Sequence, residues 1–162
     1  YKSGEKEREE HYKNGQREGM SIYWNDSGQK YRETHYKNGK KDGLDTSRDS
    51  SGKKFSTSHY KNGKLEGLET GWYESGQKQY ETPYKNGERD GLATSWYESG
   101  KKMSETYYKS GKEEGLKTVW YESGRKKYKM HFKNGIENGL WTEWSEDGKK
   151  TFEGNFIDGN EE

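Results

Sequence analysis

Apolar and polar residues alternate along short segments of this chain. Tyr80, Thr82 and Tyr84 stand at alternate positions, and the segment from Leu92 to Trp96 repeats the arrangement. A period of two is typical of a β-strand, and Tyr, Trp and Thr favour strands. Segments between glycines are no longer than about a dozen residues, which argues against helices. The pattern predicts an all-β chain of short strands.

Glycines divide the chain into equal units. Twenty of the 22 glycines fall into three series with a spacing of 24 residues, and Gly71 and Gly154 stand outside them. The series are Gly4, Gly28, Gly52, Gly76, Gly100, Gly124 and Gly148; Gly15, Gly39, Gly63, Gly87, Gly111, Gly135 and Gly159; and Gly19, Gly43, Gly67, Gly91, Gly115 and Gly139. A fixed period of this length predicts a repeat array. We expect residues 1–162 to form one array of about six and a half repeats.

Two of these series mark turns between strands. Asn-Gly, a strong hairpin signal, occurs at Asn14, Asn38, Asn62, Asn86 and Asn134, and the other turn carries Ser-Gly six times. The prediction is an elongated array of consecutive antiparallel β-hairpins in a single-layer twisted sheet. A single repeat buries too few large side chains to offset the entropy of ordering it, so stacking on neighbouring repeats must stabilise the array.

The length of the Asn-Gly loop decides which residues share a face. A two-residue loop, Asn86-Gly87, would pair Tyr84 with Arg89 and place the tyrosine and tryptophan sets on opposite faces. A three-residue loop pairs Tyr84 with Glu88 and brings both sets to one side. We favour the three-residue loop; a bulge at Gly91 would restore the same parity. The third glycine series is expected where a neighbouring Tyr ring crosses bare backbone.

Composition limits the core and the partners. Hydrophobic residues make up 23% of the chain and charged residues 36%, but 14 Tyr and 6 Trp recur periodically. The core is therefore expected to be thin and aromatic. A net charge of +1 with no basic block argues against nucleic acid. No membrane span, signal peptide or cysteine is visible, and the start at Tyr1, within a repeat, suggests part of a longer chain.

Two polar series have candidate functions. His11, His35, His59 and His131 share one repeat position, but equivalent positions lie roughly 10 Å apart, so no two could share a metal ion. We interpret them as solvated residues beside the tyrosines. Lys6, Lys30, Lys54, Lys78, Lys102, Lys126 and Lys150 could bind anionic lipid or an acidic peptide. We favour a solvated edge neutralised by Glu9, Glu33, Glu81, Glu105 and Glu153.

Nothing in the sequence supports catalysis. Ser, His, Asp and Glu recur with the period, whereas a catalytic set needs one pocket with converging groups. The non-periodic residues supply neither a nucleophile nor an acid–base pair. The glycines sit at hairpin turns and form no phosphate-binding loop. No cofactor or metal is predicted, and the chain is expected not to be an enzyme.

The repeat resembles a known family. The pattern Tyr-Lys-Asn-Gly-(x)3-Gly-Leu-x-Thr-x-Trp-Tyr-Glu-Ser-Gly-x-Lys is similar to the MORN repeat, in its bacterial 24-residue form, over essentially the whole chain. The resemblance implies a twisted sheet of hairpins and a role in binding proteins or, in some members, membranes. Some bacterial relatives are described as antitoxins of toxin–antitoxin pairs.

Two positions depart from the pattern. Arg48 stands where other copies have Trp, so we expect weaker packing there and a candidate bend or local recognition spot. Trp141 has the opposite parity from Trp144 and is expected to point to the polar face.

The leading hypothesis is a scaffold that binds a protein or peptide through an aromatic face or open sheet edges, with end-to-end self-association as one form of edge pairing. The candidate binding residues are Trp24, Trp72, Trp96, Trp120, Trp144, Tyr36, Tyr60, Tyr84 and Tyr108. The alternatives are association with a membrane surface or anionic lipid, an aromatic cage of the choline-binding type, and inhibition of a toxin partner.

Overall fold

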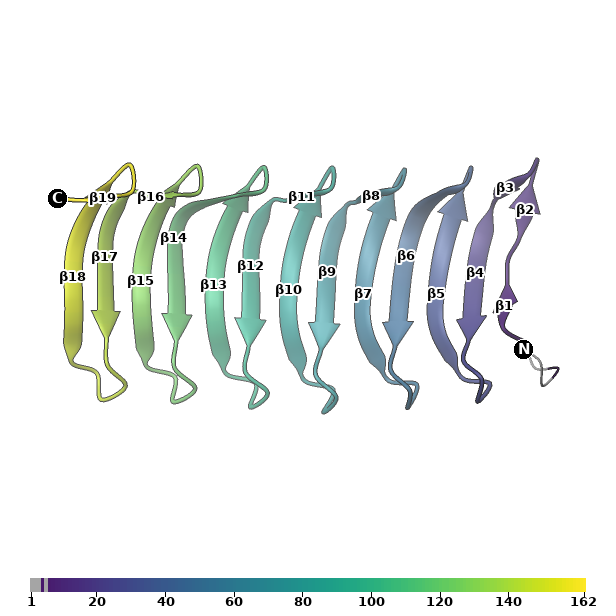
Figure 1. Cartoon of the computed structure of the whole chain (residues 1–162), viewed down its shortest axis with the longest axis horizontal. Coiled ribbons are helices and arrows are strands. Elements are labelled where there is room, and N and C mark those ends of the chain that lie inside the picture. The colour runs from purple at the N-terminus through teal and green to yellow at the C-terminus, as the bar shows by residue number, and fades with distance from the viewer. Residues whose placement is uncertain (1–3, 5) are drawn as a thin grey trace.

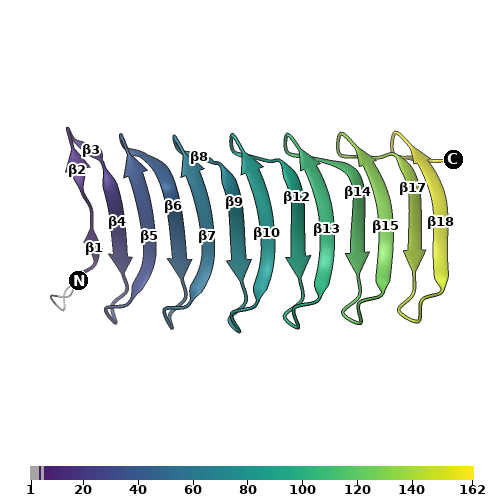
Figure 2. The same cartoon turned by 180° about the vertical axis from the view of Figure 1, so that it is seen from behind.

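The computed structural model describes residue 4 and residues 6–162; Tyr1 lies outside the described residues. Consecutive hairpins stand side by side in chain order, with the two ends of the chain at opposite ends of the array (Figures 1 and 2). All strand pairs are antiparallel, as predicted. The strands are β1 (Arg8–Glu9), β2 (Tyr12–Lys13), β3 (Gln16–Arg17), β4 (Gly19–Trp24), β5 (Lys30–Lys37), β6 (Lys40–Arg48), β7 (Lys54–Lys61), β8 (Lys64–Leu65), β9 (Gly67–Trp72), β10 (Lys78–Lys85), β11 (Glu88–Arg89), β12 (Gly91–Trp96), β13 (Lys102–Lys109), β14 (Lys112–Trp120), β15 (Lys126–Lys133), β16 (Ile136–Glu137), β17 (Gly139–Trp144), β18 (Lys150–Ile157) and β19 (Asn160–Glu161).

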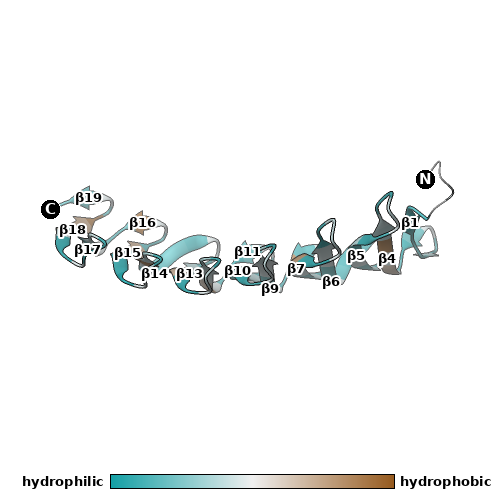
Figure 3. Ribbon diagram, turned by 90° about the horizontal axis from the view of Figure 1, so that it is seen from below, coloured by the Kyte–Doolittle hydropathy of each residue, from teal (hydrophilic) through white to brown (hydrophobic). Residues whose placement is uncertain are grey.

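In the described residues, seventeen strands form one open sheet, and β2 and β3 form a separate two-stranded pair. Seen from below, the sheet is a single layer that follows a long, shallow arc, with no second layer on either side (Figure 3). The described part of the chain contains no helix that could span a membrane. The prediction of an elongated, all-β array of consecutive hairpins is confirmed.

The Asn-Gly loop has two residues, so the preference for a three-residue loop was wrong. Tyr84 pairs with Arg89 and Lys85 with Glu88, which leaves only Asn86 and Gly87 in the loop. Both loop residues have positive φ angles, 54° and 92°. Two positive φ angles define a type I′ turn, whose twist matches that of the flanking strands. Asn tolerates this conformation because its short polar side chain bonds locally.

A second irregularity follows the turn and leaves the parity unchanged. Beyond Tyr84↔Arg89 the next pairs are Glu81↔Thr94 and Tyr80↔Ser95. The second strand therefore carries two extra residues opposite the first. Because the shift is even, the side chains of both strands keep the faces that the two-residue loop gives them. The alternative prediction, that a bulge at Gly91 brings the tyrosines and tryptophans to one face, was therefore also wrong.

The sheet consequently has two different aromatic faces. Tyr36, Tyr60, Tyr84 and Tyr108 lie on one side, which we call the tyrosine face. The other side, which we call the tryptophan face, carries Trp24, Trp72, Trp96, Trp120 and Trp144. Tyr80 and Ser95 pair on the tyrosine face, and Trp96, the residue after Ser95, points the opposite way.

Threonine and serine, rather than the aromatic rings, occupy the most buried positions. Thr34 and Ser21 are 1% exposed, and Met130 is the only described apolar side chain classed as buried. Other buried members of these rows are Thr46, Ser58, Thr70, Thr82, Thr106, Thr118 and Thr142. They lie in mid-strand on both faces, whereas the Trp and Tyr rows are half-buried. The expected aromatic core is therefore a pair of threonine rows flanked by aromatic rows.

Four of the six glycines in the third series lie beside histidine or proline side chains. A Cβ on Gly91 would stand 2.9 Å from Cγ of Pro83, and one on Gly43 would stand 3.1 Å from Cβ of His35. The expected Tyr ring over bare backbone occurs instead at Gly71, where a Cβ would overlap the ring of Tyr80. Gly71 thus has a packing role although it belongs to no series.

Hydrogen bonds join neighbouring repeats at both edges of the sheet, and the tyrosine contact at the second edge occurs in three repeats. At the Asn-Gly end, the Glu66 carboxylate accepts a 2.7 Å hydrogen bond from the backbone N–H of Asn86. At the other end, the Tyr73 hydroxyl donates to the carbonyl of Trp96 over 2.8 Å. Equivalent acidic contacts start from Glu18, Asp42, Asp90 and Glu114, and equivalent tyrosine contacts from Tyr97 and Tyr121. These bonds fix the spacing of repeats along both edges of the sheet.

Candidate functional site

The predicted binding residues do not form a single strip. The turn geometry sends the tyrosines and the tryptophans to opposite sides, so a partner that contacts one set cannot contact the other from the same side. Each face therefore has to be considered as a separate candidate surface.

On the tyrosine face, basic side chains stack against the tyrosine rings. The Arg17 guanidinium lies 4.0 Å from the centre of the Tyr36 ring, and the Lys41 ammonium lies 4.5 Å from that of Tyr60. The Arg89 guanidinium lies 5.2 Å from the ring centre of Tyr108. Cation–π contacts of this kind hold the rings upright and leave their hydroxyl groups at the surface.

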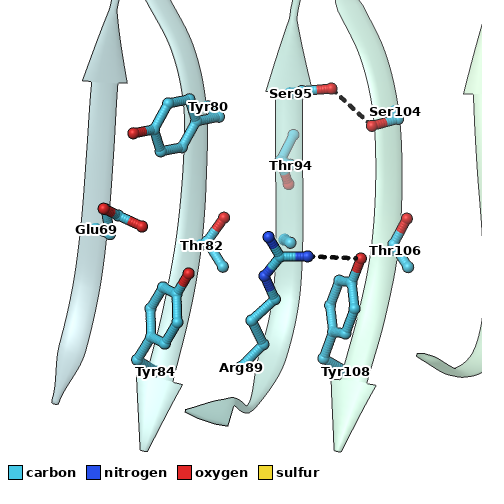
Figure 4. Close-up of a pocket in the computed structure, with 11 residues that line it drawn as sticks. Glu69, Tyr80, Thr82, Tyr84, Arg89, Thr94, Ser95, Ser104, Thr106 and Tyr108 are labelled. Carbon is cyan, nitrogen blue, oxygen red and sulfur yellow. Dashed lines mark hydrogen bonds between the residues drawn. The ribbon is translucent and has the colours of Figure 1, made fainter. Parts of the chain in front are cut away.

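A hollow of about 350 Å³ opens on the tyrosine face across β9, β10, β12 and β13. Tyr84, Arg89 and Tyr108 stand along its edge nearest the Asn-Gly turns, and Tyr80 lies towards the other end of the strands (Figure 4). The floor consists of small and hydroxylated side chains, those of Thr82, Ala93, Ser95, Ser104 and Thr106. Thr94 also lines the hollow, although its pairing with Glu81 places its side chain on the tryptophan face. The site combines aromatic walls with many hydroxyl donors and acceptors, which suits a ligand that is partly apolar and partly polar.

Three small residues create this hollow: Ala93 and the cross-strand pair of Ser95 and Ser104. Ala93 occupies the position that is Glu69 one repeat earlier and Lys117 one repeat later. Ser95 and Ser104 pair across the strands with their hydroxyl oxygens 2.6 Å apart. The equivalent pairs elsewhere contain a large side chain in all but one copy, as in Val119↔Tyr128. The hollow is thus a non-periodic feature of a periodic surface.

Its charged groups are held in place by their neighbours. Arg89 donates a 3.3 Å hydrogen bond to the Tyr108 hydroxyl, and a hydrogen bond with Tyr84 raises the pKa of Arg89, so its positive charge is secure. Burial, reinforced by the Glu69 carboxylate, raises the pKa of Tyr80, so its phenol stays neutral. The hollow therefore presents the cation of Arg89, the carboxylate of Glu69 and the neutral phenol of Tyr80.

A charged cluster lies further along the same face, towards the N-terminus. Asp45 is 7% exposed in its side chain and bonds to Arg32 at 2.8 Å and to Lys41 at 2.5 Å. Thr34 donates a third hydrogen bond of 2.8 Å. Burial raises the pKa of Asp45, but these hydrogen bonds outweigh it and lower the pKa to about 2. The hydrogen bonds within this cluster stabilise the sheet, and Arg32, Thr34 and Lys41 also line a hollow of about 380 Å³ beside Tyr23 and Tyr36.

The tryptophan face carries an exposed leucine row. Leu44, Leu68, Leu92, Leu116 and Leu140 are 37%, 41%, 50%, 39% and 47% exposed. The lysine series lies on this face, and its members pair with glutamates, as in Lys78–Glu81 at 2.5 Å and Lys30–Glu33 at 3.2 Å. The expected neutralisation is confirmed for these pairs, although each pair lies within one strand rather than across two. Lys78 also stacks 5.8 Å from the Trp96 ring.

The four histidines lie on the tryptophan face rather than beside the tyrosines. Nδ1 of His35 lies 3.3 Å from the carbonyl oxygen of Leu44, and the other three repeat this contact at 3.0–3.3 Å. In the part of the chain that the structure describes, no group of three His, Asp or Glu side chains is placed to hold a metal ion.

The predictions made for Arg48 and Trp141, the two departures from the repeat, are each wrong in part. The register from Gly43↔Tyr60 to Arg48↔Lys54 matches that of the other copies, so strand pairing is undisturbed at Arg48. Arg48 bonds instead to Glu33 over 3.0 Å. Next to it, Phe55 is 58% exposed and, with Trp72, lines a hollow of about 320 Å³ on the tryptophan face.

Trp141 does face away from Trp144, but the surface it joins is aromatic, not polar. Its ring centre lies 5.4 Å from that of Phe152 and 5.3 Å from that of Phe156 on the tyrosine face. Among the described residues, its indole Nε1 is the buried side-chain polar atom that has no hydrogen-bond partner.

Sequence reasoning missed two sets of residues. The acidic residue immediately before the third glycine, such as Glu66, bonds the next turn, and its recurrence at that position was the available signal. The residue two positions after the Asn-Gly dipeptide, such as Arg89, stacks on the next tyrosine. Its identity changes from repeat to repeat, so only the correct parity would have placed it beside the ring.

Comparison with known proteins agrees with this architecture. A sequence model of the family described as MORN repeat variant matches residues 17–38, 65–86, 89–110, 113–134 and 137–158, which together cover more than half of the chain. These segments leave out residues 39–64, which include Arg48. A search of curated proteins finds no significant match. Repeats of this family form scaffolds rather than catalytic centres, and the chain belongs to the MORN repeat variant family.

Proposed function

We propose that this protein is a non-enzymatic scaffold that binds a protein partner through its tyrosine face. The observation that carries the proposal is the hollow over Ala93, bounded by Tyr84, Arg89 and Tyr108. Tyr and Arg are typical anchors of protein interfaces because they combine a large contact area with hydrogen bonding. A side chain of the partner would enter the hollow and bond to its hydroxyl groups.

Adjacent residues on opposite faces provide a direct test. A photo-crosslinking amino acid is introduced at Ala93, on the floor of the hollow, or at Leu92, which points to the tryptophan face. In cells that express the protein, we expect crosslinking to one discrete partner from position 93 and not from position 92. Adding Tyr108→Ala should remove that product. Crosslinking from position 92 alone, or from neither position, would reject the tyrosine face as the binding surface.

The tryptophan face is a second candidate because its leucine row is exposed. A partner on this side would contact Leu68, Leu92 and Leu116 together with the neighbouring tryptophans. Replacing Trp72, Trp96 and Trp120 with Ala should then abolish binding in a pull-down experiment while far-UV spectra persist. Under our proposal the same triple variant retains its partner.

Membrane association and a choline-type cage find less support. Glutamates neutralise several of the lysines that would contact anionic lipid, as in Lys78–Glu81 and Lys102–Glu105. On the tyrosine face, the protein's own Arg17, Lys41 and Arg89 already lie against the rings that would enclose an ammonium group. The toxin-inhibitor alternative specifies the identity of the partner, and the sheet-edge alternative specifies a mode of contact. Neither specifies which face of the sheet is bound. The crosslinked product would identify such a partner directly.

A further inference from the structure

The tyrosine face carries opposite charges at its two ends. In the row that stacks on the tyrosines, the successive residues are Arg17, Lys41, Leu65, Arg89, Glu113, Glu137 and Glu161. The row is basic in the N-terminal repeats and acidic in the C-terminal repeats. The repeat itself is regular, so this gradient comes from a position at which the sequence does not repeat.

The remaining charges on this face strengthen the gradient. Over residues 8–48 the tyrosine face carries Arg8, Arg17, Arg32 and Lys41 against Glu10 and Asp45. Over residues 104–161 it carries Glu113, Glu137, Glu143 and Glu161 against Lys117. Between them lies the hollow, with Glu69 at one side and Arg89 between Tyr84 and Tyr108 at the edge nearest the Asn-Gly turns. The face is thus positive, neutral and negative in turn.

The two charged regions act independently on a partner. Lys41 and Glu113 are separated by six strand steps, or about 29 Å at roughly 4.8 Å per step. Exposed charges are screened beyond about 8 Å at physiological ionic strength. A partner must therefore match each region locally, and one compact charged group cannot satisfy both.

We propose that the tyrosine face orients a partner segment that is acidic at one end and basic at the other. The proposal rests on the proposed function and specifies its partner. The acidic end lies over the N-terminal repeats, beside Arg17 and Lys41, and the basic end lies over Glu113 and Glu137. The middle of the segment places a side chain in the hollow over Ala93.

Length and shape favour a segment over a second copy of the chain. From Arg17 to Glu137 the face spans ten strand steps, or about 48 Å, which an extended chain of about fifteen residues covers. A second copy turned end for end would also match the charges. However, the face is hollowed at its middle and again beside Tyr23 and Tyr36, so two such faces would enclose unfilled space.

The test uses two synthetic peptides of about sixteen residues with the same composition. The first alternates Glu with Thr in one half and Lys with Thr in the other; the second mixes Glu and Lys throughout. We expect the segregated peptide to bind the full chain at least about ten-fold more tightly at low ionic strength. Equal affinities would overturn the proposal.

The orientation of the bound peptide is the decisive measurement. A nitroxide on the acidic end of the segregated peptide should broaden the amide resonance of Gly39 rather than that of Gly135. In the variant Arg8→Glu, Arg17→Glu, Glu137→Lys, Glu143→Lys, the broadening should move to Gly135. The control reverses two ion pairs on the tryptophan face, by Lys78→Glu, Glu81→Lys, Lys102→Glu and Glu105→Lys, and should leave the orientation unchanged.

The outcomes separate this inference from the proposed function. Crosslinking at Ala93 with no reorientation in the charge-reversed variant would retain the binding face and reject the charge-directed segment. A stable dimer in light scattering that the charge-reversed variant abolishes would assign the face to a second copy and overturn the proposal. Circular dichroism of each variant checks that the sheet is intact.

Discussion

The Tyr97 hydroxyl donates a 2.7 Å hydrogen bond to the backbone carbonyl of Trp120, which lies one repeat further along the chain. Tyr73 bonds to Trp96 and Tyr121 to Trp144 in the same way. At the turns that contain Gly28 and Gly52 the position is Asn25 and Asp49, whose side chains bond back to their own turns. The connection between repeats at this edge is therefore strongest in the C-terminal half of the array.

Removing this hydroxyl tests how much the connection contributes. Tyr97→Phe should lower the free energy of unfolding by about 0.5–1.5 kcal/mol, the usual net value of one hydrogen bond. Urea denaturation followed by tryptophan fluorescence measures the change. Tyr107→Phe is the matched control, since Tyr107 is 45% exposed on the tryptophan face, and it should have little effect. Equal losses in both variants would mean that the hydrogen bond contributes nothing specific.

The hydrogen bond that Glu66 accepts at the opposite edge should contribute a similar free energy to stability. Glu66→Ala removes the acceptor for the backbone N–H of Asn86, and we expect a loss of about 1 kcal/mol in unfolding free energy. The exchange rate of the Asn86 amide hydrogen should rise in the same variant. Glu88→Ala changes an exposed carboxylate in the same repeat and serves as the control. An unchanged exchange rate at Asn86 would contradict the prediction.

Two glycines of the third series separate backbone strain from crowding. Gly91 and Gly115 both have positive φ angles, 119° and 73°. A Cβ at position 91 would stand 2.9 Å from Pro83, whereas one at position 115 would meet nothing within 4 Å. Gly115→Ala should cost about 1–2 kcal/mol from backbone strain alone, and Gly91→Ala should cost clearly more. Thermal unfolding of the two variants gives the comparison, and equal costs would contradict the prediction.

The stability of the array should depend on pH through Asp45. Its pKa is lowered to about 2 from an ordinary value of 3.8, so its contribution is present above pH 3.8 and disappears as the pH falls through 2. A shift of this size corresponds to about 2 kcal/mol. Urea denaturation between pH 5 and pH 2 should show that Asp45→Asn removes this part of the acid sensitivity. An equally steep pH dependence in the variant would point to other carboxylates.

The sequence predicts the repeat, the hairpins and both turn positions because glycine and asparagine place direct demands on the backbone. Asn86 and Gly87 adopt the positive φ angles that this dipeptide favours. The faces were predicted wrongly because the parity depends on the number of loop residues and on the later shift of two residues. The same Asn-Gly signal fits loops of either length, so the spacing alone could not decide between them.

The candidate site was only partly predictable for the same reason. Tyr84 and Tyr108 were predicted to lie on an aromatic binding face, but Arg89 and Ala93 come beside them only in the observed register. The buried threonine rows were also missed. In a single-layer sheet, the mid-strand positions are covered by the longer side chains on both flanks, and that shielding is a property of the assembled array.

Among the described residues, strand pairing, the tyrosine bonds and the acidic contacts each join a repeat to its immediate neighbour. Such a body can grow or shrink through duplication or deletion of a 24-residue stretch of coding sequence without any change elsewhere. The length of the array can therefore change in evolution with the number of repeats. The residues exposed on each repeat can change independently of those on the others.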